Sequence, residues 1–296
     1  LTDYRLRMIP SGSGDTIGKT GIGTGPFIVE KFDPEGTTIL KANSNHWEGA
    51  PGLSEVHVIA IPDGEARVQA LLTGQIDMNR YVPFSQKKIF DGNSKFSVSV
   101  IPTGNWRGMV MRTDTAPFDN PKVRKAVRLA VDRQELVDLV MGGAAIVACD
   151  TPVAPSDQYR MDMACPQNIS KAKNLLREAG YPNGIEMVIH VSTKEPTWPT
   201  IGEVLQQQLA KANIKAEVKM TPSKSYWKET WMKKAVAMTR WNERPADSAL
   251  HEIYHSGAKW NESFFKNPAF DENLAKARGE LDFNKRKAAY QNAQKT

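Results

Sequence analysis

Long apolar runs are missing from this sequence of 296 residues, and none approaches the roughly 20 residues that a helix needs to cross a bilayer. Clustered positive charge is missing as well, because the 39 Lys and Arg residues, set against 33 Asp and Glu, are scattered along the chain. The net charge of +6 comes without the mixture of basic and aromatic residues that nucleic-acid recognition uses. We therefore expect neither a membrane-spanning helix nor a nucleic-acid partner.

Cysteine is scarce, and the two that occur, Cys149 and Cys165, flank a single loop rich in Pro and Asp. A bridge between them would close a loop of roughly 15 residues and, in the chain-entropy model, contribute about 3 kcal/mol. The alternative is two unrelated free thiols. We hypothesise a disulfide, which would favour an oxidising compartment such as the periplasm.

Signals for catalysis are few. The glycine-rich stretch at residues 21–26 lacks the Lys-Ser/Thr ending of a phosphate-binding loop and precedes a strand pattern. His251-Glu252-Ile253-Tyr254-His255 matches H-E-x-x-H, which on a helix places two imidazoles on one face for zinc, with Glu252 as general base. A third histidine is absent downstream, and Glu262 or Glu272 would have to replace it. A zinc-dependent hydrolase is therefore the alternative function, while we expect no enzyme, no metal and no cofactor.

The stretch from Thr103 to Gly143 has the clearest local pattern. A strand at residues 106–113 leads to Asn120-Pro121, where Asn suits the N-cap of a helix and Pro its first position. The helix then carries one apolar face at i, i+3, i+4 and i+7, formed by Val123, Ala126, Val127 and Ala130. Asp132 with Glu135 resembles a capping box that begins a second helix, ended by Gly142-Gly143.

The remaining pattern predicts an α/β protein. With 296 residues and a hydrophobic content of 40%, the chain can form the cores of roughly two domains. Before residue 103 we expect a helix after Asp63 and strands at 27–29, 37–42, 55–61, 76–78 and 96–101. After the cysteine loop we expect helices near 170–179, 201–209, 223–233, 269–280 and 283–294, and strands at 185–191, 214–220 and 235–241.

Four blocks of the chain, in order, resemble the bacterial extracellular solute-binding proteins of family 5, the dipeptide- and oligopeptide-binding-protein-like receptors of ABC importers. The most specific block is PFDNPKVRKAVRLAVDRQELV, residues 117–137. The others are Gly23–Gly49, Ser170–Gly184 and Asn267–Gln294. The resemblance implies a periplasmic-binding-protein-like fold whose two lobes have mixed sheets flanked by helices. It also implies periplasmic capture of a small polar solute between the lobes, for delivery to a membrane ABC permease.

Set against that family, the chain resembles its middle and C-terminal part. We expect residues 1–104 to form an incomplete first lobe and residues 105–296 a second lobe. The resemblance also implies that an N-terminal portion and an extreme C-terminal strand of the family are not represented. Its members bind peptides, opine-like acids and other polar compounds, so the resemblance does not choose among these.

Two segments are candidates for the ligand site, because the resemblance places both toward the ligand. The first is Asn105-Trp106-Arg107, and the second supplies Trp241, Asn242, Arg244 and Asp247. Core packing is the alternative for either tryptophan, and a surface ion pair is the alternative for Arg244. Peptide-binding members carry an acid where this chain has Arg244. Because an inward-facing Arg favours a carboxylate or phosphate, we expect a ligand with an acidic group.

Overall fold

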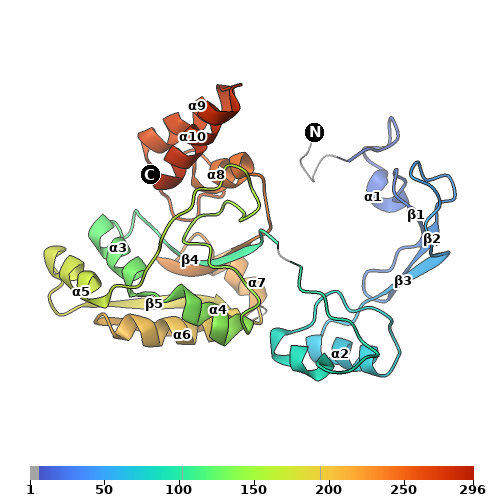
Figure 1. Cartoon of the computed structure of the whole chain (residues 1–296), viewed down its shortest axis with the longest axis horizontal. Helices are drawn as coiled ribbons and strands as arrows, with labels where there is room; N and C mark the ends of the chain where they lie inside the picture. Colours follow the sequence, from blue (N-terminus) through green and yellow to red (C-terminus); the bar gives the residue numbers. More distant parts are fainter. Residues whose placement is uncertain (1–6, 102, 194) are drawn as a thin grey trace. The chain divides into compact units, whose positions relative to one another are not determined.

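The computed structural model describes residues 7–101, 103–193 and 195–296. They form two compact units that divide between Val98 and Ser99 (Figure 1). This boundary lies a few residues before the one that we expected between the two lobes, and the division into lobes at 104/105 stays a prediction. None of the helices formed by the described residues has the length and apolar character of a membrane-spanning segment.

The first unit is built on a three-stranded antiparallel sheet in which consecutive strands are hydrogen-bonded neighbours: β1 (Phe27–Lys31), β2 (Thr37–Ala42) and β3 (Glu55–Ile59). Three helical segments accompany the sheet: α1 (Ile17–Thr20), α2 (Gly64–Leu72) and the 3-10 helix η1 (Phe84–Phe90). Among the described residues of this unit, the buried hydrophobic side chains are Val68, Ala70 and Phe90.

Two strands predicted near the first unit are wrong. Residues 76–78 and 96–101 lie outside every strand, and β3 ends at Ile59 rather than Ile61. A single apolar or alternating segment becomes a strand only when another segment pairs with it, and sequence alternation does not supply that partner. The strand–helix–strand layer expected here is consequently absent from the described residues.

The second unit has a mixed four-stranded sheet in the order β4-β7-β5-β6. The edge strand β4 (Trp106–Met111) runs antiparallel to β7 (Val236–Trp241). Strand β5 (Ile185–Ser192) runs parallel to both β7 and β6 (Ile214–Thr221), and α6 (Trp198–Ala210) connects β5 to β6. The predicted βαβ unit is confirmed. Its core includes the fully buried Trp198, Ile189 and Leu209.

Three further helices pack on this core: α3 (Pro121–Ala130), α4 (Arg133–Met141) and α5 (Ile169–Glu178). Asn120 caps α3 as predicted, since its side chain accepts from the backbone N–H of Lys122, and the four predicted apolar residues of that helix are all buried. Asp132 caps α4 by accepting from Gln134 N and Glu135 N. Residues 223–233 form only the short α7 (Ser223–Ser225) and a π-helix, η2 (Tyr226–Thr230).

The capping box expected at the start of α4 is half right. Glu135 does not reach back to the backbone N–H of Asp132, because Gln208 of α6 takes that place. Gln208 Oε1 accepts from Asp132 N at 3.0 Å, while its Nε2 donates to Asp132 O at 3.0 Å and to Glu135 Oε2 at 2.6 Å. One buried amide thus links α6 to the first turn of α4.

Cys149 and Cys165 form a disulfide across the loop that follows α4. The residue beside it, Asp150, pairs with Arg128 at 2.8 Å and with Arg133 at 2.7 Å. Burial alone would raise the pKa of Asp150, but the charges and hydrogen bonds of Arg133 and Arg128 bring that pKa below its usual value. Two ion pairs of Asp150 therefore also connect the disulfide-bridged loop to α3 and α4.

The C-terminal helices α8 (Ala246–Tyr254), α9 (Pro268–Gly279) and α10 (Phe283–Lys295) gather in one group (Figure 1). They share a second core, to which Leu250, Phe270, Leu274 and Tyr290 contribute. Helix α8 begins directly after the C-terminal end of β7, so this group carries the residues that follow Trp241.

Candidate functional site

The two predicted ligand segments meet at one edge of the second unit's sheet. Trp106, the first residue of β4, is the register partner of Trp241, the last residue of β7. The C-terminal end of β5 lies at the same edge, because β5 runs parallel to β7. In open α/β sheets, ligands bind in the crevice outside the carboxyl ends of the strands. This edge is therefore the candidate site.

Two hydrogen bonds from backbone N–H groups to side-chain oxygens connect the two segments. Glu243 N donates to Asn105 Oδ1 at 2.7 Å, and Gly104 N donates to Glu243 Oε2 at 2.9 Å. A Cβ on Gly104 would lie 2.5 Å from Ala154 Cβ and 2.6 Å from Glu243 Cγ, so only glycine fits there. Asn105 thus supports the β7 end, and its role toward a ligand stays a prediction.

Glu262 is buried beneath this edge, with 5% of its surface exposed. It accepts hydrogen bonds from Thr239 Oγ1 at 2.9 Å and Trp241 Nε1 at 2.8 Å. Burial raises the pKa of Glu262, although these two donors act in the opposite direction. The sequence suggested Glu262 only as a possible zinc ligand, and no local pattern indicated that it would orient Trp241.

Arg244 faces a carboxylate, but one supplied by the chain itself. Its Nη1 lies 2.6 Å from Glu252 Oε2, and the two side chains are only 10% and 16% exposed. Arg244 also lies over the Trp241 ring, 5.1 Å from its centroid, and Glu252 Oε1 accepts from Ser248 Oγ at 2.8 Å. Arg244 therefore forms an ion pair within the chain, which was the alternative to ligand binding, but this pair is largely buried rather than at the surface.

Asp247 and Asn242 differ in their surroundings. Asp247 makes a two-pronged contact with Arg278 of α9, at 2.7 and 2.9 Å, and accepts from Tyr290 Oη at 3.2 Å. Those contacts hold the C-terminal helices together. Asn242 is exposed at the turn after β7. A contact of either residue with a ligand stays a prediction.

A pair of arginines occupies the next position of the same two strands. Arg107 of β4 is the register partner of Arg240 of β7. Arg240 Nε donates to Glu195 Oε1 at 2.7 Å. Arg107 belongs to the predicted site, whereas nothing in the sequence indicated that Arg240 and Glu195 would lie beside it.

Comparison with known proteins settles the family. The model of the bacterial extracellular solute-binding proteins, family 5 Middle, matches residues 7–261. The chain belongs to this family. It is 29% identical over 297 residues to the glutathione-binding protein GsiB of Pectobacterium atrosepticum, covering 95% of this chain and 57% of that protein. The GsiB of Salmonella choleraesuis is 30% identical over 295 residues, with the same coverage. The chain thus spans about 57% of the length of these relatives.

Solved structures agree with the family. The periplasmic binding protein DppA of Helicobacter pylori, in complex with the peptide STSA, matches with a TM-score of 0.77 and 26% identity, over 92% of this chain and 55% of that one. NikZ of Campylobacter jejuni, in complex with Ni(L-His), matches with a TM-score of 0.81 over 94% of this chain and 59% of that one. At 21% identity the second likeness shows the fold alone. The predicted α/β periplasmic-binding-protein-like fold is confirmed.

The H-E-x-x-H motif does not assemble a zinc site in this family member. Helix α8 ends at Tyr254, and His255 follows in an extended conformation, so the two histidines do not share one continuous helix. Glu252 is engaged by Arg244 and Ser248, and Glu262 by Thr239 and Trp241. Within the described parts of the chain, no group of three His, Cys, Asp or Glu side chains is arranged to hold a metal ion.

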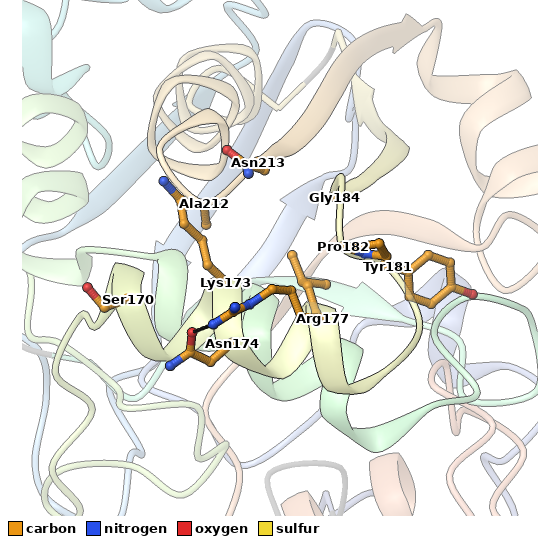
Figure 2. Close-up of a pocket in the computed structure, with 10 residues that line it drawn as sticks. Ser170, Lys173, Asn174, Arg177, Tyr181, Pro182, Gly184, Ala212 and Asn213 are labelled. Atoms are coloured by element: carbon orange, nitrogen blue, oxygen red, sulfur yellow. Dashed lines mark hydrogen bonds between the residues drawn. The ribbon is translucent and has the colours of Figure 1, made fainter.

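One hollow of the second unit lies away from the candidate site. It lies between α5 and the beginnings of β5 and β6 (Figure 2). Its volume is about 290 Å³. Its lining includes Lys173, Asn174, Arg177, Tyr181 and Asn213. These residues lie at the amino edge of the parallel strands, the opposite end from Trp106 and Trp241.

Proposed function

We propose that this chain acts in a solute-binding receptor of an ABC importer. In the periplasm it would capture a small polar solute and deliver it to a membrane permease, without catalysing a reaction. The family match supports this proposal. One observation supports a location for the ligand site: β4 and β7 bring Trp106 and Trp241 together at the carboxyl edge of the sheet. Two tryptophans there offer apolar surface beside a few fixed polar groups, which is the usual makeup of a small-molecule site.

The solute we propose is peptide-like or an acidic conjugate. The relatives named above support this class, since GsiB is a glutathione-binding protein and DppA was solved with the peptide STSA. Asn105, Trp106, Arg107, Trp241 and Asn242 are the residues we propose to face it. Arg244 and Asp247 contribute by fixing α8 under Trp241, because each is engaged by a partner within the chain.

A thermal-shift screen tests the proposed function. The protein is scanned against peptides, amino-acid conjugates, sugars and metal chelates, each with zinc or with EDTA. A compound that binds only the folded state increases the free energy of unfolding by mass action, by about 2.7 kcal/mol at one hundred times its Kd, and so raises Tm. We expect a shift with one organic class that EDTA leaves unchanged. A shift with zinc alone, reversed by EDTA, would contradict solute capture.

A further inference from the structure

Backbone contacts fix the walls of the hollow beside α5. Tyr181 N–H donates to Leu176 O at 2.8 Å, so the chain that follows α5 folds back on that helix. Ile185 N–H donates to Asn213 O at 3.2 Å, which joins the beginning of β5 to the residue before β6. A Cβ on Gly184 would lie 1.8 Å from Asn213 O, so only glycine allows this close approach. The hollow is therefore formed before any ligand arrives.

Two positive charges line this hollow with no negative charge to balance them. Lys173 and Arg177 lie one turn apart on α5, a spacing at which like charges destabilise a helix. Within the described parts of the chain, neither forms an ion pair, and no lining residue is Asp or Glu. Glu178, the next residue of α5, pairs instead with Lys122 of α3 at 3.0 Å. The hollow therefore has two positive charges in excess.

Neutral hydrogen-bond donors lie beside the two cations. Arg177 Nη2 donates to Asn174 Oδ1, the dashed contact in Figure 2, which holds the guanidinium along α5 and leaves the amide N–H groups of Asn174 as donors. Lys173 extends from α5 toward Ala212 and Asn213 on the opposite wall (Figure 2). The side-chain amide of Asn213 adds further donors there. Cations and amide donors thus surround one small space, which suits an anion.

We propose that this hollow is a second binding site, which takes the phosphate group of a small phosphate monoester on Arg177 and Lys173. Such a group carries a charge of about −1.5 to −2 near neutral pH and three acceptor oxygens, which matches two cations and the neighbouring amide donors. The guanidinium fork suits two of those oxygens. A carboxylate has one charge and would neutralise half of the excess. The proposal goes beyond solute capture, because the hollow lies at the opposite end of the parallel strands from Trp106 and Trp241.

Two probes carry this phosphate group, glycerol 3-phosphate as a free ester and phosphatidic acid as a lipid headgroup. The full chain is titrated by isothermal titration calorimetry with glycerol 3-phosphate, and with glycerol and acetate at the same ionic strength. We expect saturable binding of the phosphate ester and of neither control compound. Arg177→Gln and Lys173→Gln should each weaken that binding by about tenfold or more, the factor for one charge-assisted hydrogen bond. Arg177→Lys should fall between, because it keeps the charge and loses the fork.

Sedimentation with phosphatidylcholine vesicles, prepared with and without phosphatidic acid, identifies the source of the phosphate. Sedimentation that requires phosphatidic acid and is lost in Arg177→Gln would assign the hollow to a lipid headgroup. Binding of glycerol 3-phosphate without such sedimentation would assign it to a soluble ester. Either result supports the site.

Lys171→Gln is the matched control, because Lys171 is an exposed residue of α5 outside the lining of the hollow. It should bind both probes as the wild type does. An equal loss of binding in Lys171→Gln and Lys173→Gln would show attraction by overall charge and overturn the site. Binding of neither probe by the wild type, or binding of acetate as tight as that of the ester, would overturn it as well. Each of these results would leave solute capture at the carboxyl edge standing.

Discussion

At the scale of single residues, Glu262 links the core of the second unit to the candidate site. Its buried carboxylate holds the indole of Trp241 and the hydroxyl of Thr239. A carboxylate with so little water around it is costly to ionise, which is why its pKa is raised. The orientation of Trp241 thus depends on a residue that follows it by 21 positions.

Glu262→Gln should change how stability depends on pH. The folded pKa lies above the unfolded value of about 4.3, so the stability that Glu262 contributes is full below the unfolded pKa and is lost as pH rises through the folded pKa. Glutamine does not titrate and can still accept from Trp241. The free energy of unfolding of Glu262→Gln, minus that of the wild type, should therefore increase over that window, as measured by urea unfolding at a series of pH values.

Glu272→Gln is the matched control for that series. Glu272 is a surface residue whose pKa is lowered by its hydrogen bond to Lys276. For Glu272→Gln, the free energy of unfolding minus that of the wild type should decrease, not increase, as pH rises. If the difference in free energy of unfolding between Glu262→Gln and the wild type did not vary with pH, ionising Glu262 in the folded protein would have no cost.

Single residues also show what the sequence could predict. Trp106, Arg107 and Trp241 were predicted because the family resemblance places toward the ligand the two strand ends on which they lie. Glu195 was not, since its contact with Arg240 spans 45 positions and depends on the parallel order of β5 and β7. The role of Arg244 was inferred from its chemistry, and the carboxylate that it contacts came from α8 rather than from a ligand.

At the scale of elements, Gln208 joins two helices. Gln208→Ala would leave the N–H of Asp132 and a carboxylate oxygen of Glu135 without their partner in a buried setting. Each group left unsatisfied in this way costs about 1–3 kcal/mol. We expect the free energy of unfolding to fall by at least the lower figure, as measured by urea denaturation.

Gln207→Ala is the control for this prediction, because Gln207 is the exposed neighbour on the same helix. It should leave stability almost unchanged, since alanine is a good helix former. Equal stability of the two variants would show that the contact between Gln208 and α4 contributes nothing.

The disulfide closes the loop between α4 and α5. Replacing Cys149 and Cys165 together by Ser should lower the free energy of unfolding by about 2–4 kcal/mol, because the unfolded chain regains the freedom that the loop had lost. Reductant should destabilise the wild type and leave the double variant unaffected. Non-reducing peptide mapping that found both thiols free would contradict the bridge.

Helix caps were predictable from the sequence, whereas two of the predicted strands did not form. The caps at Asn120 and Asp132 and the apolar face of α3 follow from residues three or four positions apart, and all of them form. Residues 76–78 and 96–101 have a strand pattern but no partner, and pairing is a property of the whole fold. The second half of the capping box failed for the same reason, because a residue of α6 competed for Glu135.

At the scale of the whole molecule, the family and the fold were predictable because four separate blocks occur in the family's order. The order and direction of the strands within each unit were less predictable. The second unit combines an antiparallel edge strand with a parallel sheet, and its C-terminal helices form a core of their own. The proposed function depends on the edge where β4 begins and β7 and β5 end, a place that exists only once the sheet has formed.

The most direct test of solute capture at that edge is the affinity of Trp106→Ala for the compound that gives the largest thermal shift, measured by isothermal titration calorimetry. Loss of a central aromatic contact typically costs about 2 kcal/mol or more, so we predict that Kd rises by at least about tenfold, while Trp106→Phe keeps most of the affinity. Circular dichroism establishes that both variants are folded. An unchanged Kd in folded Trp106→Ala would contradict a ligand site at the Trp106–Trp241 edge.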